Sequence, residues 1–347
     1  MTFKDLHELG YNMNHFYYCH VMLPQHILVV VIHHVLLCTM SRDGKRVLCV
    51  GLVCLDIVKM VADYPQEDSA QRCLDCVWQR GGNASNTSSV LALLGQPVEY
   101  FGTVAQSQEL RFLREDFASY GVSLDHIVVC PNTSCPLSVV IVNTRNGSRT
   151  ILHTNNNLRE ANADDFRTID LSGNKYKWIH FECRPNVQET VRMLEHVHNH
   201  NITAGVHSVV TSVEFEKPGR KGCEQLFALP DYLFLSKEFA QDFGYDNMED
   251  AVVGFSTKTK PGATVICAWG DKGAAAKSSD SDVVISPAVK LERVVDTLAA
   301  GDTFIAGSIF SLSGGEVSIA EAIGYGCEVA GKKCGMRGLK GLASLKS

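Results

Sequence analysis

Residues 47–57 read VLCVGLVCLDI, a nearly continuous apolar run that is rich in Val and Leu. Such a run is typical of a strand that is buried on both faces, as the strands of parallel sheets are. The run ends near Asp56, and in open α/β sheets the carboxyl ends of the strands face the ligand crevice. We therefore predict one buried strand here, with Asp56 at the edge of a binding site.

Similar short apolar runs follow along the chain and alternate with helical patterns. The runs lie at residues 138–142, 178–181, 232–235 and 264–268. Residues 187–198 and 319–334 carry apolar residues at intervals of three and four, which is the period of an amphipathic helix. This alternation predicts an α/β fold, a doubly wound and mostly parallel sheet flanked by helices.

Two other segments show the alternating polar and apolar pattern of a half-exposed sheet. They are residues 57–80 and residues 135–155, and the second contains SVVIVN and SRTILHT around an Asn146-Gly147 turn signal. We predict that they form a small β-sheet lid over a cleft. The predicted organisation is one α/β domain at residues 46–341, followed by a short tail at residues 342–347.

The first 45 residues differ from the rest of the chain. Their apolar run at residues 27–37 is interrupted by His33 and His34, and it is shorter than the about 20 apolar residues of a membrane-spanning helix. The basic region and the small-residue cleavage site of a secretory signal are also missing. We interpret residues 1–45 as an atypical N-terminal extension, with a weak membrane or targeting role as the alternative.

The composition limits the class of protein. The chain has 347 residues, 45% of them hydrophobic and 20% charged, which is the range of soluble globular proteins. Its net charge is −6 and no basic block stands out, so the footprint of a nucleic-acid-binding protein is absent. The 13 cysteines are odd in number and scattered, which favours reduced thiols and a cytoplasmic location. We expect neither a nucleic acid nor a membrane as a partner.

The strongest chemical signal is VDTLAAGDTF at residues 295–304, where small residues run directly into a helical pattern. Such a turn exposes backbone N–H groups at the positive end of the helix dipole, where phosphate oxygens bind. Asp302, at that helix start, can take the proton of a hydroxyl group that attacks a γ-phosphate. An Asp that merely caps the helix is the structural alternative.

A second signal is RGGNASN at residues 80–86, ahead of another helical pattern. The paired glycines allow close approach of the backbone, and the Asn carboxamides can donate and accept hydrogen bonds, which suits sugar hydroxyls. Taken alone, Gly-Gly-Asn before a helix is more often a tight turn with a cap.

The two motifs in this order resemble the two signature segments of the ribokinase-like (PfkB) family of carbohydrate kinases. Further matches at residues 64–69, 78–80, 147–151, 213–218, 267–269 and 329–335 resemble the members of the family that phosphorylate ketohexoses. The resemblance implies ATP-dependent phosphorylation of a ketohexose, D-fructose giving D-fructose 1-phosphate. It also implies Mg²⁺ as a cofactor, K⁺ as an activator, and a homodimer formed through the lid sheets.

The resemblance implies a role for each matched residue. Asp302 would be the catalytic base, and the anion hole would be the backbone of Ala299, Ala300 and Gly301. The residues implied in sugar binding are Asp56, Asp68, Gly82, Asn83, Asn86 and Arg149. Arg149 would reach the transferring phosphate from the lid. The other residues implied in nucleotide binding are Trp269, Gly270, Asp271, Lys272, Gly273 and Cys327.

The chain departs from the family pattern at four places. The family usually has Gly at Ala299, and a Cβ there costs about 1 kcal/mol if the position needs a positive φ. Residues 183–186 (CRPN) and 153–157 (HTNNN) replace other sequences near the expected cleft, which puts the choice of sugar in doubt. The Asn-x-x-Glu metal motif is absent at residues 236–239, so we expect Mg²⁺ to be held mainly by nucleotide phosphates and water.

Two weaker constellations have simpler explanations. Cys73 and Cys76 have the spacing of a metal or redox pair, but no second pair follows at a useful distance. His196, His198 and His200 form a run of which only His196 and His200 share a helix face, as on a solvated surface.

Three functions remain open at this point. The first is the kinase, with a related sugar or nucleoside kinase as its variant. The second is a weakened or non-catalytic protein that binds sugar or nucleotide, and Ala299 motivates it. The third, a nicotinamide-dependent oxidoreductase, is disfavoured because no G-x-G-x-x-G turn follows the first strand.

Overall fold

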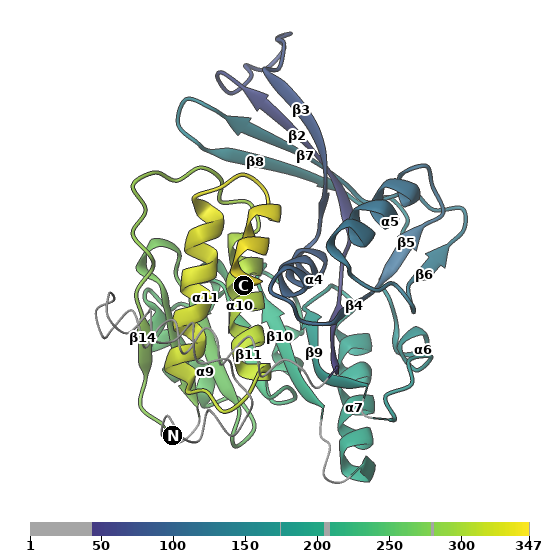
Figure 1. Cartoon of the computed structure of the whole chain (residues 1–347), viewed down its shortest axis with the longest axis vertical. Coiled ribbons are helices and arrows are strands. Elements are labelled where there is room, and N and C mark those ends of the chain that lie inside the picture. The colour runs from purple at the N-terminus through teal and green to yellow at the C-terminus, as the bar shows by residue number, and fades with distance from the viewer. Residues whose placement is uncertain (1–43, 174, 205–208, 279–280, 347) are drawn as a thin grey trace, which may run out of the picture.

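The computed structural model describes residues 44–173, 175–204, 209–278 and 281–346. Their strands form one sheet of eight strands, one of four and one of two (Figure 1). The predicted N-terminal extension falls almost wholly on residues 1–43 and so lies outside the described residues. In the described part of the chain, no helix combines the length and the apolar character needed to cross a membrane.

The eight-stranded sheet is the central layer of the molecule. Its strands are, in spatial order, β14 (Val284–Ser286), β13 (Ala274–Ser278), β12 (Thr264–Ala268), β11 (Tyr232–Leu235), β10 (Val210–Phe215), β9 (Tyr176–Glu182), β1 (Arg46–Val50) and β4 (Val98–Phe101). The strands from β12 to β4 are parallel, and β13 and β14 are antiparallel. The prediction of a mostly parallel, doubly wound sheet is confirmed. Because β1 pairs with both β4 and β9, the strand order reverses beside β1.

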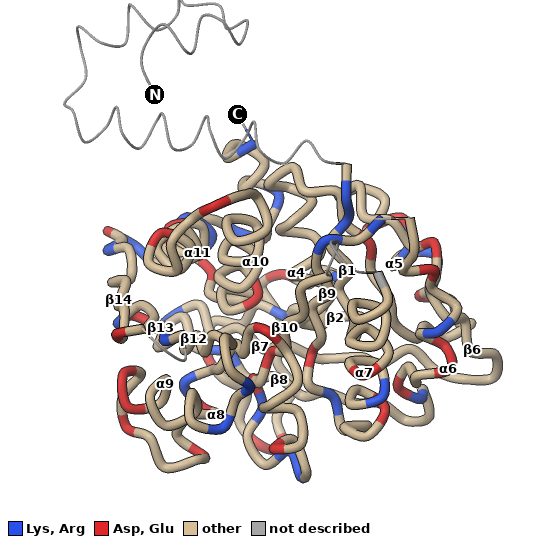
Figure 2. Tube along the Cα trace, turned by 90° about the horizontal axis from the view of Figure 1, so that it is seen from below, with Lys and Arg blue, Asp and Glu red and all other residues tan. Residues whose placement is uncertain are grey.

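Helices cover both faces of this sheet (Figure 2). One face carries α4 (Asn83–Leu93), α5 (Glu109–Tyr120), α10 (Ala300–Ser313), α11 (Ile319–Cys334) and the 3₁₀ turn η3 (Lys340–Lys346). The other face carries α6 (Ala163–Phe166), α7 (Val187–Ala204), η1 (Cys223–Leu226), α8 (Lys237–Asp242) and α9 (Met248–Ser256). In β1, the Val47 side chain packs on the face that α10 and α11 cover, and the Leu48 side chain packs on the face that α7 and α9 cover. This two-sided burial explains why the strand is apolar at successive positions.

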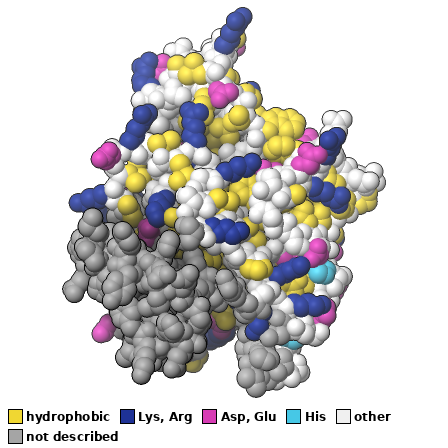
Figure 3. Space-filling view, viewed as in Figure 1, with side chains coloured by type: hydrophobic (Ala, Val, Ile, Leu, Met, Phe, Trp, Pro, Cys, Tyr) yellow, Lys and Arg dark blue, Asp and Glu magenta, His cyan; other side chains and the backbone are white. Residues whose placement is uncertain are grey.

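The four-stranded sheet stands beside the main sheet as a lid (Figure 1). Its strands are, in order, β3 (Asp75–Gly81), β2 (Cys54–Val61), β7 (Leu137–Asn143) and β8 (Arg149–Thr154). On the face drawn in Figure 3, hydrophobic side chains reach the surface of the lid between Lys and Arg side chains. The two-stranded sheet, β5 (Thr103–Ala105) with β6 (Val128–Cys130), continues the chain after β4.

The prediction of one strand over residues 47–57 is wrong. The apolar run is divided at residues 51–53 between β1 of the main sheet and β2 of the lid. Gly51 allows this crossing, because a Cβ at its position would lie 2.6 Å from the Glu182 carboxylate. Both parts of the run are buried, so its apolar pattern cannot reveal the break. Asp56 consequently lies within β2, and residues 138–142 likewise belong to the lid, as β7.

Candidate active site

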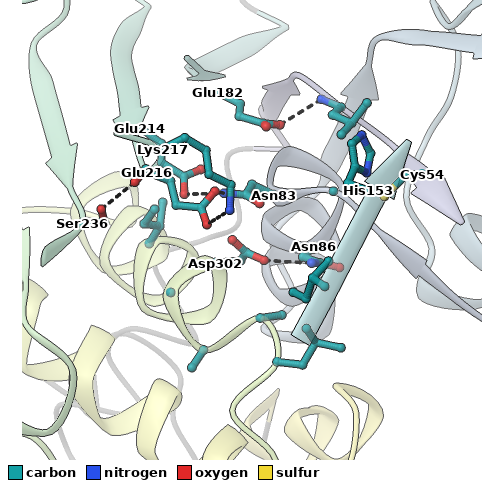
Figure 4. Close-up of a pocket in the computed structure, with 18 of the residues that line it drawn as sticks. Cys54, Asn83, Asn86, His153, Glu182, Glu214, Glu216, Lys217, Ser236 and Asp302 are labelled. Atoms are coloured by element: carbon teal, nitrogen blue, oxygen red, sulfur yellow. Dashed lines mark hydrogen bonds and ion pairs between the residues drawn. The ribbon is translucent and has the colours of Figure 1, made fainter. Parts of the chain in front are cut away.

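A cavity of about 520 Å³ lies between the main sheet and the lid. Its walls come from the carboxyl ends of β9 to β12, the N-terminus of α10, the start of α4 and the inner side of the lid (Figure 4). The carboxyl ends of parallel strands beside a reversal of strand order are where doubly wound sheets bind ligands. The cavity is therefore the candidate active site.

Asp302 lies in the first turn of α10 with its carboxylate in the cavity wall. It is 6% exposed, and one carboxylate oxygen accepts a hydrogen bond of 2.8 Å from Asn86 Nδ2 of α4. Burial raises the pKa of Asp302 well above its usual value; the Asn86 hydrogen bond opposes the shift, and Glu216 and Glu182 add to it. No side chain caps α10, so the capping alternative for Asp302 has no support. A buried carboxyl group with a raised pKa is a stronger base than an exposed one.

The start of α10 presents backbone donors beside this carboxylate. The N–H groups of Ala300, Gly301 and Asp302 belong to the first turn and have no acceptor within the helix. That of Ala300 donates to Thr297 O at 3.2 Å. A Cβ built on Gly301 would meet open space, so the turn is accessible from the cavity. This end of the helix can bind a phosphate group.

Ala299 precedes the helix in the left-handed conformation, with φ 63° and ψ 20°. A side chain with a Cβ is disfavoured there by about 1 kcal/mol relative to glycine. The departure from the family pattern at this position is therefore a source of backbone strain. Thr303 N–H and the Thr303 hydroxyl both donate to Ala299 O, at 3.0 and 2.7 Å, and they help to hold the strained turn.

The loop ahead of Ala299 is tied to the last helix by Asp296. One Asp296 carboxylate oxygen accepts from Leu298 N–H at 2.9 Å. The other accepts from Gly338 N–H at 3.1 Å and lies 2.6 Å from Lys333 Nζ, whose side chain is 1% exposed. Lys333 Nζ also donates to Asp296 O at 2.9 Å. A buried ion pair thus fixes the entry to α10.

Gly82, Asn83 and Asn86 come together at the start of α4. Gly82 has φ 98°, and a Cβ there would lie 2.2 Å from Leu52 O, so only glycine fits. Asn83 Nδ2 donates to both Glu214 Oε1 and Glu216 Oε2, each at 2.8 Å. The two carboxamides therefore project from one helix turn into the cavity, each fixed by a carboxylate (Figure 4).

The lid contributes Asp56 and Arg149. Asp56 lines the cavity from β2, 7% exposed, and accepts from the Cys54 thiol at 3.4 Å. Burial raises its pKa, and hydrogen bonds from Ser138 and Cys54 oppose the shift. The Arg149 guanidinium, from the first residue of β8, contacts Thr297 Oγ1. Arg149 thereby bridges the lid and the loop that leads into α10.

Asp68 does not line the cavity of its own chain. It is exposed, in the connection between β2 and β3, with φ 55°. Its predicted contact with the sugar is therefore not formed within one chain.

Of the residues implied in nucleotide binding, Arg149, Ala299, Ala300 and Gly301 line the cavity, whereas the other six lie beside it. Ala268, the last residue of β12, lines it, and Trp269 to Gly273 follow around the 3₁₀ turn η2 (Gly270–Lys272). Gly273 has φ 99°, and a Cβ there would lie 2.0 Å from Ser286 O. The buried Cys327 thiol, on α11, also faces Ser286 O, at 3.9 Å. These residues group around β14 at the other side of the α10 start.

Sequence reasoning missed a set of charged residues in the cavity wall. They are Glu160, Glu182, Arg184, Glu214, Glu216 and Lys217. Arg184 pairs with Glu182 at 2.9 Å and with Glu160 at 2.8 Å. Burial lowers the pKa of Arg184, but these two carboxylates outweigh burial and raise it. The available signal was position, because Glu182 and Glu214 lie at the carboxyl ends of β9 and β10.

The weaker constellations do not join this site. Cys73 and Cys76 are exposed free thiols on the lid. His196 and His200 line a separate shallow groove along α7. At residues 236–239, the Ser236 hydroxyl caps α8 by accepting from Phe239 N–H at 2.9 Å, and it donates to Glu216 O at 2.7 Å.

Comparison with known proteins agrees with this geometry. The profile described as pfkB family carbohydrate kinase matches residues 45–343. Ketohexokinase of Mus musculus is 45% identical over 301 residues, which are 86% of this chain and 99% of that protein.

Two solved structures share the fold. A putative ribokinase from Agrobacterium tumefaciens superposes with a TM-score of 0.70 at 21% identity, over 86% of this chain and 94% of its own. The ribokinase of Arabidopsis thaliana, complexed with ribose and ATP, gives a TM-score of 0.68 at 17% identity, over 88% and 99% of the two chains.

Proposed function

The chain belongs to the pfkB family of carbohydrate kinases, and from this premise we propose that it phosphorylates D-fructose to D-fructose 1-phosphate with ATP. The similarity to a ketohexokinase supports a ketohexose as the sugar. The observation that carries the proposal is the buried Asp302 carboxylate beside the open backbone donors of α10, in one cavity with Asn83, Asn86 and Asp56. A base, an anion site and sugar ligands are thus grouped at the carboxyl ends of the strands.

In the proposed reaction Asp302 accepts the proton of the primary hydroxyl as its oxygen attacks the γ-phosphorus. The bond from the γ-phosphorus to the bridging oxygen breaks, and ADP leaves. Backbone N–H groups at the start of α10 and the Arg149 guanidinium stabilise the charge on the transferring group. Asn86 holds the Asp302 carboxylate in place by its hydrogen bond.

The start of α10 fits the phosphates of ATP, since Ala300 and Gly301 line the cavity and a Cβ at Gly301 would meet open space. The described residues contain no group of three or more His, Cys, Asp or Glu side chains placed to hold a metal ion. As expected from the missing Asn-x-x-Glu motif, we propose that nucleotide phosphates and water would mainly hold Mg²⁺, which would neutralise charge on the β- and γ-phosphates.

Release of ADP by the purified full chain, with MgATP and D-fructose, tests the proposal. We expect turnover that disappears in Asp302→Asn. Turnover with another sugar or a nucleoside, and none with D-fructose, would replace the proposed substrate. The altered segments at residues 153–157 and 183–186 contribute His153 and Arg184 to the cavity, so such a change of substrate is the outcome to test first.

A non-catalytic binding protein is the second candidate function, and the left-handed Ala299 favours it. If strain displaces the anion site, the chain would bind ATP and sugar without transfer. Calorimetric binding of both ligands, with no ADP released across a panel of sugars and nucleosides, would establish this function and overturn the kinase proposal.

We also propose that two copies associate through their lid sheets. Large apolar side chains are exposed on the lid, namely Tyr64, Leu74, Val77, Trp78, Ile151 and Leu152. A second copy could bring its Asp68 to the sugar, which this residue does not reach within its own chain. Light scattering should give a dimer for the full chain and a monomer for Trp78→Glu. Val253→Glu, at an exposed apolar residue on α9, is the control outside the lid.

Two further expectations belong to the same proposal. Family resemblance supports K⁺ as an activator, which comparison of rates in potassium and tetramethylammonium salts tests. Every cysteine that the structure describes is a free thiol, which supports a cytoplasmic location. Imaging of the full-length chain in cells tests that location.

A further inference from the structure

A buried histidine faces the cavity wall from behind. His180 lies in β9 with 0% of its surface exposed, and it does not line the cavity. Its Nε2 is 3.8 Å from Glu214 Oε2, an oxygen of the neighbouring strand β10. Neither atom has a hydrogen-bond partner among the described residues. An unsatisfied buried polar atom costs about 1–3 kcal/mol, so a small approach of the two atoms is favoured.

The neighbours of His180 favour one position for the proton of its ring. Trp178 Nε1–H can only donate, and it donates to Ser212 Oγ at 2.8 Å. The Ser212 hydroxyl can then donate its own proton to His180 Nδ1, which lies 2.8 Å away. Burial lowers the pKa of His180 to about 3, so the ring is neutral, and a proton on Nε2 leaves Nδ1 free to accept from Ser212. The His180 N–H group therefore points at Glu214.

Glu214 in turn fixes the carboxamide of Asn83. Its other oxygen, Oε1, accepts from Asn83 Nδ2, and Glu216 Oε2 accepts the second proton of the same nitrogen. Both N–H donors of Asn83 are thus engaged. The opposite orientation of the carboxamide would place its oxygen against two carboxylates. Asn83 can therefore offer the cavity only its Oδ1, which is an acceptor.

We propose that His180 is a positioning residue for sugar binding. Through Glu214 it orients Asn83 so that the Asn83 oxygen accepts a hydrogen bond from one sugar hydroxyl. This inference rests on the proposed function and deepens it, because it states what the sugar must supply at one position: a hydrogen-bond donor. This series of contacts, which runs from Trp178 through Ser212, His180 and Glu214 to Asn83, transfers no proton in the reaction. It orients Asn83 before the chemical step.

Two substitutions distinguish the effect of losing the Nε2–H donor of His180 from the effect of changing the size of its side chain. His180→Gln keeps an N–H group near the position of Nε2, whereas the shorter His180→Asn reaches only toward Ser212. We expect His180→Asn to raise the KM for the sugar up to about tenfold, the effect of weakening the one hydrogen bond between Asn83 and a sugar hydroxyl. The KM for ATP and kcat should stay within about twofold, and His180→Gln should restore most of the sugar affinity. His196→Asn, on α7 and outside the cavity, is the matched control.

Deoxyfluoro sugars give the sharpest measurement, since fluorine replaces a hydroxyl group with a substituent that cannot donate. The analogue that lacks the hydroxyl facing Asn83 should bind the wild type poorly. It should bind His180→Asn no more weakly, because both changes weaken the same hydrogen bond between the sugar and Asn83. Additive losses at every hydroxyl position would overturn the inference. Equal losses in kcat and in both KM values for His180→Asn and His180→Gln would also overturn it, since they would indicate a structural role only.

A spectroscopic test does not depend on the substrate. The ¹⁵N chemical shifts of His180 in the histidine-labelled full chain report the tautomer directly. We expect a protonated Nε2 and an unprotonated Nδ1. Another tautomer, or an imidazolium ring, overturns the inference even if the chain is an active sugar kinase. If the wild type phosphorylates no sugar, the proposed function fails, and the tautomer alone then decides whether the His180–Glu214 arrangement exists.

Discussion

The two walls of the cavity are built differently. On the main-sheet side Glu182, Glu214 and Asp302 are buried, and each is held by a partner from another element. On the lid side Arg149 and His153 are exposed, whereas Asp56 is buried together with its neighbours Cys54 and Ser138. Groups that transfer a proton must be fixed before the reaction, whereas groups that select a sugar need only meet it. Substitution of the proposed base, Asp302, in the main-sheet wall should therefore lower kcat, and substitution of a sugar ligand in the lid should raise the KM for the sugar.

The largest effect is expected for Asp302→Asn, in the main-sheet wall. Loss of a positioned base lowers kcat by about 10²–10⁴-fold. The KM for the sugar should change little, because the Asn86 hydrogen bond can be kept by the new side chain. Steady-state kinetics at saturating ATP measure both constants. A rise in KM with an unchanged kcat would break the comparison of the two walls.

The same substitution should raise the free energy of unfolding at neutral pH. The folded-state pKa of Asp302 is raised, chiefly by burial, so the folded chain binds this proton more tightly than the unfolded chain. The destabilisation is absent below the unfolded-state pKa and grows as pH rises toward the folded-state pKa. Asp302→Asn should therefore be more stable than the wild type in urea unfolding at pH 7 and about equal to it below pH 4. Equal stability at both pH values would contradict the raised pKa.

Arg149→Met comes next and sharpens the comparison, because Arg149 belongs to the lid but contacts Thr297 of the loop that enters α10. Loss of one charged donor at the transferring phosphate should lower kcat roughly a hundredfold. Arg145→Met is the matched control, an exposed arginine of the same lid that pairs with Asp63 at 2.6 Å. If Arg149→Met instead changes only the KM for the sugar, Arg149 acts as the rest of the lid does.

Asp56→Asn tests the lid side itself. We expect the KM for the sugar to rise about tenfold, the effect of weakening a hydrogen bond to a charged group, and kcat to stay nearly constant. Asp63→Asn, at an exposed carboxylate of the lid, should leave both constants unchanged. A larger loss in kcat than in sugar affinity would place Asp56 functionally with the main-sheet wall.

The smallest effect is expected for Ala299→Gly. Relief of the left-handed strain should stabilise the fold by up to about 1 kcal/mol, partly offset by the greater entropy of glycine in the unfolded chain. Turnover should rise a few-fold if strain displaces the anion site. Ala300→Gly, one residue later and helical, should destabilise the fold by about 0.5–1 kcal/mol. If thermal unfolding shows Ala300→Gly to be more stable than Ala299→Gly, the proposed backbone strain at Ala299 is contradicted.

Much of the fold could be predicted from the sequence, namely the segments whose pattern of apolar residues matches the strand or helix that they form. The runs at residues 232–235 and 264–268 are β11 and β12, and the helical pattern at residues 319–334 is α11. These elements are buried by neighbours that require only an apolar surface. The break at Gly51 could not be predicted, because β1 and β2 are both buried and only their pairing partners distinguish them.

The candidate site divides in the same way. Asp302, Asn83 and Asn86 lie in local motifs, and the structure brings them into one cavity. Arg184, Glu160 and Lys217 could not be identified, because they belong to the site only through the register of β9 and β10 and the course of the loops after them. Asp68 shows the converse limit, since a sequence match names a residue but does not say whether it reaches the cavity of its own chain.

The pairing of Asp296 with Lys333 and Gly338 bears on how the protein is made. The ribosome releases residues 295–304 before it releases the residues that hold them in place. The nascent chain can thus complete its main sheet and lid while the entry to α10 is still unanchored. A transcript that stops after residue 313 would encode every residue of the cavity wall, yet the loop before α10 would lack its ion pair. The residues after α10 thus serve the site without lining it, because they hold the loop that leads into this helix.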